Sequence, residues 1–110
     1  MKFMIIKTRQ ETKKILFKDI LYIISHPNKA HHVQIVTKED VYSCPQTLKN
    51  LEELYSEDLI RCHRRCLVNI SKICSVNRQE KIILLGENGD YCVTFSRRRH
   101  QEILQKWLRK

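Results

Sequence analysis

The chain of 110 residues carries 21 lysine and arginine residues against 12 aspartate and glutamate residues, for a formal net charge of +9 at pH 7. This length allows one domain with one modest core, and the hydrophobic share of 42% excludes a disordered chain. So large an excess of positive charge predicts a polyanionic partner, because each neutralised phosphate releases condensed counterions.

Apolar runs and cysteines limit where the protein acts. The longest apolar runs, such as "CLVNI" and "KIILL", are far too short to span a bilayer, so no membrane partner is expected. The N-terminus "MKFMIIKTRQ" has a short apolar stretch and no small-residue cleavage site, unlike a signal peptide. Five cysteines, an odd number, are untypical of a secreted disulfide scaffold. These features predict a cytoplasmic protein with reduced cysteines.

The segments before Pro45 have the composition of strands. They are short, rich in Ile, Val, Tyr and Phe, and separated by charged or turn residues; they cover residues 2–8, 13–17, 19–24, 32–36 and 41–44. The connections between them are too short for crossover helices. Antiparallel pairing is therefore expected.

After Pro45 the hydrophobic period changes. In residues 46–58, leucines recur three or four positions apart, which predicts one amphipathic helix with Thr47 as its N-cap. Strand patterns return at 59–63, 72–76, 81–85 and 91–95, and Asn88-Gly89 predicts a tight hairpin between the last two. Residues 96–110 predict a terminal helix that Ser96 caps and Trp107 anchors. The expected fold class is mainly β, with one short mid-chain helix and a C-terminal helix.

The stretch "RCHRRC", residues 61–66, contains groups that bind metals or perform catalysis elsewhere. No C-x-x-C pair occurs, and in a regular strand Cys62 and His63 would point to opposite faces. Glycine-rich phosphate loops and recognisable pairs of catalytic carboxylates are also missing from the sequence. The sequence therefore predicts no metal, no cofactor, no small-molecule substrate and no enzymatic activity.

A redox pair is a separate hypothesis. If the strands at 59–63 and 91–95 are neighbours, Cys62 and Cys92 could approach the α-carbon separation of about 4.4–6.8 Å that a disulfide requires. Nearby arginines would favour the reactive thiolate. The alternative is that both are inert, half-buried thiols.

Basic and polar residues gather in three segments: residues 25–32, the arginines at 61, 64 and 65, and the arginines at 97, 98 and 99. Each has a loop's composition or adjoins the end of a strand. Arginine and lysine in loops suit phosphate contacts, and a guanidinium can bind guanine O6 and N7 bidentately. Three such segments favour nucleic-acid binding over solvated surface charge.

Three motifs resemble the LytTR-type DNA-binding domain, the output domain of bacterial response regulators of the accessory-gene-regulator and competence-regulator type. They are "FKDILYI" (17–23), "RCHRRCLVNISKI" (61–73) and "FSRRRHQEI" (95–103), in the family's order and over nearly the whole chain. The resemblance implies an elongated arrangement of small antiparallel sheets, with loops inserted into successive major grooves of double-stranded DNA. It also implies one domain over residues 1–110, without the family's receiver domain.

Carried over by position, the resemblance assigns base contacts to His31, Arg64 and Arg97, with His31 and His32 exchangeable. The phosphate or flanking contacts fall on six residues: Asn28, Lys29, His32, Arg61, Arg65 and Arg98. His63 is as well explained by a structural role as by a contact, and Asn69 is expected to hold a turn through its amide. The implied partner is promoter DNA with repeated sites, on which two copies of the protein could dimerise.

Two other functions stay open at this stage. One is an RNA-binding or ribosome-associated basic β domain, although stacking on single-stranded bases needs exposed aromatics and the chain has only eight Phe, Tyr and Trp residues. The other is a thiol-based redox-sensing module built around Cys62 and Cys92.

Overall fold

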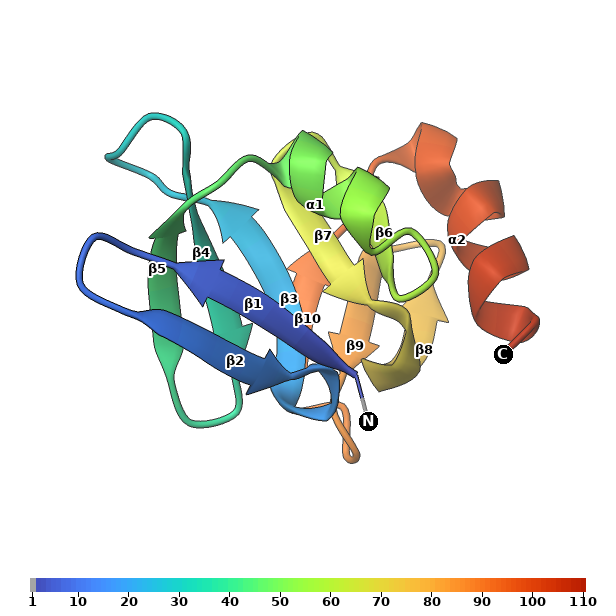
Figure 1. The fold of residues 1–110 in the computed structure, drawn as a ribbon. Coiled ribbons are helices and arrows are strands. Elements are labelled where there is room, and N and C mark those ends of the chain that lie inside the picture. Colours follow the sequence, from blue (N-terminus) through green and yellow to red (C-terminus); the bar gives the residue numbers. More distant parts are fainter. Residues whose placement is uncertain (1) are drawn as a thin grey trace.

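The computed structural model describes residues 2–110 and is mostly β (Figure 1). The strands are β1 Phe3–Lys7, β2 Thr12–Leu16, β3 Ile20–Ser25, β4 His32–Thr37, β5 Val41–Pro45, β6 Leu59–His63, β7 Cys66–Asn69, β8 Ile73–Asn77, β9 Ile82–Leu85 and β10 Tyr91–Thr94. The helices are α1 Leu48–Leu54 and α2 His100–Leu108, with 3-10 turns η1 Phe17–Asp19, η2 Ile70–Lys72 and η3 Arg97–Arg99. The predicted fold class is confirmed.

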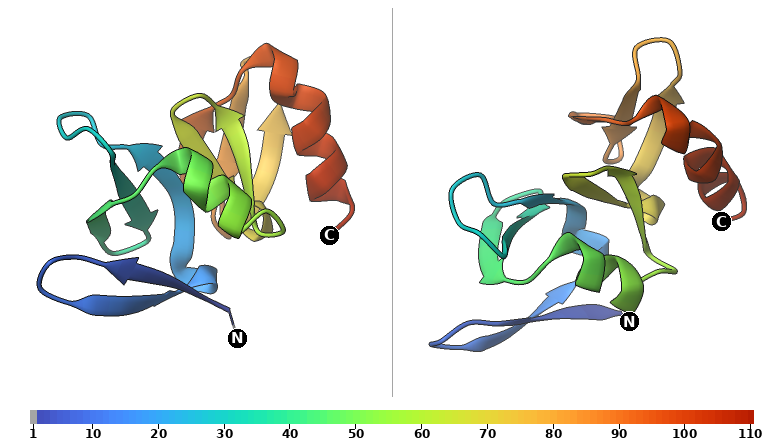
Figure 2. Two further views of the ribbon diagram at one scale, coloured as in Figure 1. Left: turned by 45° about the horizontal axis from the view of Figure 1, so that its top comes forward. Right: turned by 90° about the horizontal axis from the view of Figure 1, so that it is seen from above.

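The strands form three small antiparallel sheets. A two-stranded sheet has the order β1-β2, a five-stranded sheet the order β5-β4-β3-β7-β6, and a three-stranded sheet the order β10-β9-β8. Figures 1 and 2 show the five-stranded sheet between the other two, with α1 over one end of it and α2 beyond β6. The principal extents of 43 × 29 × 24 Å make the domain elongated.

The part of the five-stranded sheet formed by β3, β7 and β6 packs on both faces, so the domain has two cores. Side chains alternate along a strand, and in β7 Leu67 therefore packs in one core while Val68 packs in the other. Leu59 and Ile60 of β6 are divided in the same way. The continuous apolar run in β7 is thus explained by its place inside the sheet.

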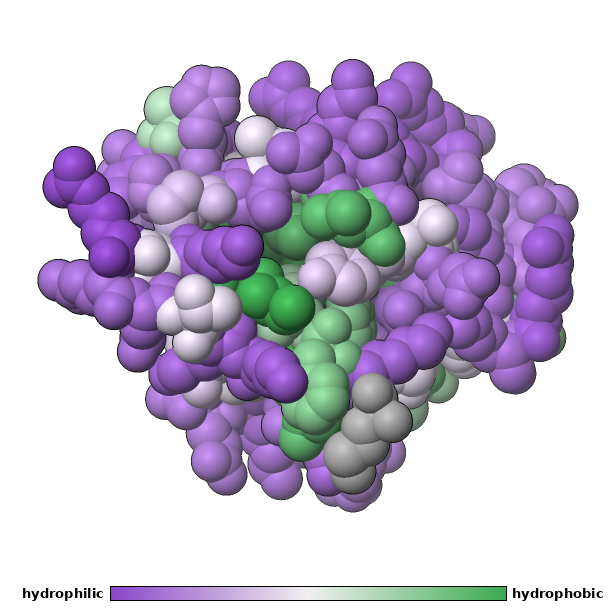
Figure 3. Space-filling view, in the orientation of Figure 1, coloured by the Kyte–Doolittle hydropathy of each residue, from purple (hydrophilic) through white to green (hydrophobic). Residues whose placement is uncertain are grey.

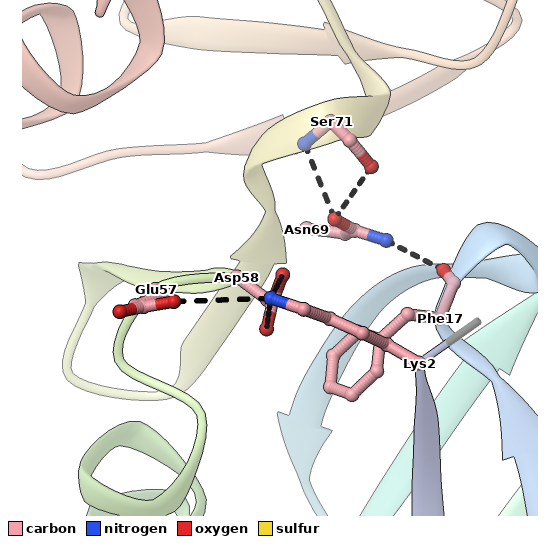
Figure 4. Close-up of polar contacts among 6 residues, drawn as sticks. All are labelled: Lys2, Phe17, Glu57, Asp58, Asn69 and Ser71. Atoms are coloured by element: carbon pink, nitrogen blue, oxygen red, sulfur yellow. Dashed lines mark hydrogen bonds and ion pairs between the residues drawn. The ribbon is translucent and has the colours of Figure 1, made fainter. Parts of the chain in front are cut away.

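Asn69, at the end of β7, connects three backbone segments from a buried position (Figure 4). Its Nδ2 donates to the carbonyls of Phe17 at 2.7 Å and Ile20 at 2.8 Å. Its Oδ1 accepts from the Ser71 N–H at 3.2 Å and the Ser71 hydroxyl at 2.9 Å. The predicted role of this amide in holding a turn is confirmed. Figure 4 also shows Lys2 beside Asp58 and Glu57, an ion-pair group at the surface.

Some helix and hairpin details differ from the predictions. Thr47 caps α1 as expected, because its hydroxyl accepts from the Asn50 N–H at 3.2 Å. Ser96 makes no such cap, since η3 comes before α2. Ile103 is the fully buried residue of α2, whereas Trp107 is half-buried.

The connection between β9 and β10 is also longer than the predicted tight hairpin. It runs over residues 86–90, with positive φ angles of 95° at Gly86 and 69° at Gly89. L-residues with a side chain rarely adopt such angles, which explains glycine at both positions.

No helix within residues 2–110 is long and apolar enough to cross a membrane. Figure 3 shows a mostly hydrophilic surface with one apolar area between β1 and α1. Exposed Phe3 and Ile5 lie on β1, and exposed Leu54 ends α1.

Candidate nucleic-acid interface

The β3–β4 loop and the β6–β7 turn emerge at the same end of the five-stranded sheet. The register places Ser25 opposite Val33 and Ile24 opposite Cys66. His63 is also opposite Cys66, so the turn of residues 64–65 begins beside the end of β3. Antiparallel pairing therefore brings the first two basic segments to one edge.

Backbone hydrogen bonds join all three basic segments. The Ser25 N–H donates to the Arg65 carbonyl at 3.1 Å, and the Ser96 N–H donates to the Cys62 carbonyl at 2.8 Å. The second bond ties the start of η3 to the end of β6. Figure 1 shows the β3–β4 loop, the β6–β7 turn and η3 along its upper edge, and Figure 2 agrees. We call this edge, which carries His31, Arg64 and Arg97, the three-loop edge.

Histidines set the shape of the first loop. His26 Nδ1 accepts the N–H groups of Asn28 at 3.0 Å and Lys29 at 3.1 Å. His32 is half-buried and its Nδ1 lies 2.9 Å from the Ala30 carbonyl. His31 is exposed and has a φ of 57°. Of the two exchangeable histidines, only His31 presents its ring outward from the loop tip.

Arg61 supports the β6–β7 turn. Its guanidinium donates to the Arg64 carbonyl at 3.1 Å and forms an ion pair with Glu52 of α1 at 3.1 Å. Its side chain is only 14% exposed, whereas Arg64 and Arg65 are exposed. Two of its guanidinium nitrogens therefore have partners inside the protein, while the buried Nε has none within residues 2–110. This arrangement favours a supporting role for Arg61 over the expected phosphate contact.

His63 lies under the same turn and is neutral at physiological pH. Its Nδ1 accepts the Arg65 N–H at 3.1 Å. Burial lowers the pKa of His63, and the positive charges of four neighbours lower it further: Arg61, Arg65, Arg99 and Arg64. A histidine whose pKa is lower in the folded chain contributes stability above its ordinary pKa, and this contribution is lost as the pH falls below about 6.5.

The third segment places Arg97 and Arg98 on the surface of η3. Arg99 is half-buried, with its guanidinium 3.9 Å from Glu102. The His100 ring stacks on Phe95 with centroids 5.7 Å apart. Arg97 is therefore held on a short, supported turn rather than on a free loop.

A cavity of about 660 Å³ beside Arg97 contains two basic residues that the sequence analysis missed. It is lined by Arg78 and Lys81 from the β8–β9 hairpin, together with Arg97 and His100. The Phe95 N–H donates to the Lys81 carbonyl at 3.0 Å, which fixes this hairpin against the third segment. Arg78 and Lys81 do not lie in a cluster of basic residues in the sequence, so no local pattern predicts that they belong to the site.

The condition for a redox pair of Cys62 and Cys92, that their strands are neighbours, is not met in the sheets. β6 pairs with β7 in the five-stranded sheet, whereas β10 pairs with β9 in the three-stranded sheet. Cys62 is fully buried and Cys92 is exposed, because Val93 is the residue that β10 directs into the core. Both thiols are free.

Alkylation of the native protein checks this arrangement. We expect iodoacetamide to modify exposed Cys74 and Cys92 quickly, and to reach buried Cys44, Cys62 and Cys66 only after unfolding. Mass spectrometry of quenched samples gives the order of labelling, and Cys92→Ser should remove one fast site. Equal labelling rates for Cys62 and Cys92 would contradict the structure.

Cys62, His63 and Cys66 each have one potential metal-ligand atom, all within 4.8 Å of one another. A register shift between Arg61 and His63 breaks the regular alternation on which the sequence argument relied. These groups are already hydrogen-bonded. Cys62 Sγ donates to the Cys66 carbonyl at 3.5 Å, and Cys66 Sγ donates to the carbonyl of the following residue at 3.6 Å. With four arginines around His63, the cluster fits internal support of the hairpin better than dication binding.

The fold and the three-loop edge define a class of elongated β domain built from small antiparallel sheets, with three basic segments at one edge. A family model described as the LytTr DNA-binding domain matches residues 10–108, so the chain belongs to this family. A solved LytTr DNA-binding domain of a response regulator from Bacillus cereus has the same fold, with a TM-score of 0.71 and 21% identity over 94% of each chain. No curated protein matched the chain.

Proposed function

We propose that this DNA-binding domain recognises specific duplex sequences in transcriptional regulation, by inserting the three-loop edge into successive major grooves. The observation that carries the proposal is the joining of three exposed basic segments by backbone hydrogen bonds at one edge. The longest extent of the domain, 43 Å, exceeds one helical turn of B-DNA, roughly 34 Å.

Within this proposal, His31, Arg64 and Arg97 contact bases. Each is exposed, and each comes from a different segment of the edge. A guanidinium can bind guanine bidentately, which suits the two arginines. His31 is preferred to His32, whose Nδ1 is occupied by the Ala30 carbonyl.

Flanking residues hold the DNA backbone. The exposed candidates are Asn28, Lys29, Arg65 and Arg98, to which the structure adds Arg78 and Lys81 beside Arg97. Arg61 supports Arg64 from within the protein, and His32 supports the first loop. These two residues act on the shape of the edge rather than on phosphates.

The RNA-binding alternative would need exposed Phe, Tyr or Trp rings for stacking, and none of the residues described in the structure places one on this edge. Single-stranded bases need exposed aromatic rings, but Phe95, the aromatic residue nearest η3 in sequence, is buried beneath His100. Phe3, which is exposed, lies on β1 in another sheet. Duplex DNA is therefore the partner that we propose, with the protein acting in the cytoplasm.

Selection and competition test this function. Duplexes enriched by the protein from a random pool should bind at fixed salt more tightly than scrambled duplexes of equal length, and single-stranded RNA should compete poorly. Equal affinity for enriched and scrambled duplexes would refute sequence recognition. Stronger competition by the RNA would favour the alternative.

Lys29→Ala should weaken binding to every duplex alike. Removing one phosphate contact is expected to reduce the slope of log K against log salt by about 1, since each contact releases condensed counterions. Lys18→Ala is the matched control, because Lys18 lies in η1 before β3, at the far end of that strand from the loop. Binding titrations at four salt concentrations measure both slopes, and equal slopes for the two variants would remove Lys29 from the interface.

We also propose that residues 1–110 act as one output domain, and that two copies dimerise on repeated promoter sites. The observation that supports one domain is the continuity of the two cores through β6 and β7, which leaves no boundary inside residues 2–110. Sedimentation of the protein with duplexes carrying one or two copies of the enriched site measures whether two copies bind together.

A further inference from the structure

We propose that His26 and His63, in their neutral form, are positioning residues whose Nδ1 atoms set the shapes of two of the three DNA-contacting loops. The inference rests on the proposed function, since it concerns the loops that carry His31 and Arg64. Neither histidine needs to touch DNA for this role.

In the first loop, His26 takes the place that an asparagine or aspartate has in an Asx turn. One atom, Nδ1, accepts the N–H groups two and three residues ahead, at Asn28 and Lys29. The His26 N–H itself donates to the His32 carbonyl at 2.9 Å, which closes the base of the loop. His31, with its positive φ, therefore sits on a loop whose other end is fixed by the His26 ring.

In the second loop, the Nδ1 of His63 has the same role but accepts one backbone N–H instead of two. Its Nδ1 accepts the N–H two residues ahead, at Arg65, while Arg61 holds the Arg64 carbonyl. The Arg65 carbonyl in turn accepts from the Ser25 N–H at the start of the first loop. The two histidines consequently support one connected stretch of backbone.

The chemistry requires a neutral ring in both places. An Nδ1 atom accepts a hydrogen bond only when the proton is on Nε2, and in the charged ring both nitrogens are donors. In the protonated ring, Nδ1–H would face a backbone N–H. Both groups are donors, so the hydrogen bond would be lost. Around His63 the surrounding charges come from Arg61 of β6, Arg64 and Arg65 of the turn, and Arg99 of η3. Burial first, and then these arginines, lower the pKa of His63 and so favour its neutral ring.

His26 has a different neighbourhood. The His32 ring of β4 meets it edge-on with centroids 6.5 Å apart, and Lys29 is the charged residue bonded to it through the backbone. A proton on His26 would release two backbone N–H groups at once. A charged ring at either position is thus expected to loosen its loop and to reduce the preference for the enriched duplex over a scrambled one.

The tautomers give a test without DNA. Long-range ¹⁵N NMR spectra of the full chain at pH 7.5 should show Nε2 protonated and Nδ1 unprotonated for both His26 and His63. A protonated Nδ1 at either position would overturn the assignment for that residue. This measurement stands even if no duplex is enriched, an outcome that would refute the proposed function instead.

Two substitutions at each histidine separate the effect of the acceptor atom at the Nδ1 position from the effect of side-chain size. Asparagine places Oδ1 where Nδ1 lies and cannot bind a proton near neutral pH, whereas glutamine places its oxygen nearer the Nε2 position. We expect His26→Gln and His63→Gln each to lower the enriched-to-scrambled affinity ratio about three- to tenfold, the value of one or two hydrogen bonds. His26→Asn and His63→Asn should keep most of the ratio.

The pH profile distinguishes this role from general stability. As the pH falls below about 6.5, the wild-type ratio should fall more steeply than that of the double variant His26→Asn/His63→Asn, which keeps the other three histidines. Thermal unfolding of each variant identifies any loss of fold, and the asparagine variants supply the comparison if a glutamine variant unfolds. Equal ratios for asparagine and glutamine variants, or the same pH profile in wild type and double variant, would refute the inference.

Discussion

Asn69→Leu is expected to lower the free energy of unfolding by about 3 kcal/mol or more, because it leaves two buried carbonyls without a donor. The wild-type amide satisfies Phe17 and Ile20 at 2.7 and 2.8 Å and also caps the turn at Ser71. Leucine has the same branching as asparagine and is larger, so the substitution leaves no cavity. Urea unfolding followed by circular dichroism measures it.

Two control variants divide the contributions of the Asn69 side chain. Asn69→Asp keeps the oxygen that accepts from Ser71 but faces the Phe17 and Ile20 carbonyls with a second oxygen, so it should be destabilised at least as strongly. Ser71→Ala removes only the hydroxyl that donates to Asn69 Oδ1, keeps the backbone N–H bond, and should cost about 0.5–1.5 kcal/mol. An Asn69→Leu protein with the wild-type urea midpoint would show that these hydrogen bonds contribute little.

The double variant Arg64→Ala/Arg97→Ala should lose most of its preference for the enriched duplex. Each arginine–guanine contact is worth about 1–3 kcal/mol of discrimination, so the pair is expected to cost about 2–6 kcal/mol if the contributions add. Additivity is reasonable because the two side chains come from different segments and share no partner within residues 2–110. Fluorescence anisotropy with enriched and scrambled duplexes measures the effect.

Lysine substitutions are the matched controls for this double variant. Arg64→Lys/Arg97→Lys keeps the charge but cannot form the bidentate contact. Its affinity for scrambled DNA should stay near wild type, while its affinity for the enriched duplex should fall toward that of the alanine variant. Equal losses on both duplexes would mean that Arg64 and Arg97 contact phosphates only.

Local patterns predicted the elements of the fold well, and features that depend on distant partners poorly. The leucine period of α1 and its Thr47 cap are visible in the sequence because they depend on residues three or four positions apart. The division of Leu67 and Val68 between two cores depends on which sheets cover β7, which no local pattern records.

The same distinction applies to the site. The arginine clusters were recognisable from composition, yet the role of Arg61 depends on Glu52 in α1, which folding brings beside it. The bulge after Arg61 changed which side chains meet in the turn, and the pairing of β10 with β9 separated Cys92 from Cys62. Arg78 and Lys81 join the site only through the packing of their hairpin against η3.

The sharing of β7 between two cores has a consequence for how the domain comes apart. Leu67 packs in one core and Val68, the next residue of β7, packs in the other. If β7 moves out of one core, it therefore also moves out of the other. The loop end and the opposite end of the sheet are therefore expected to melt together in a single cooperative transition. A protein that holds DNA with short loops then has no half-folded form that keeps some of those loops and loses others.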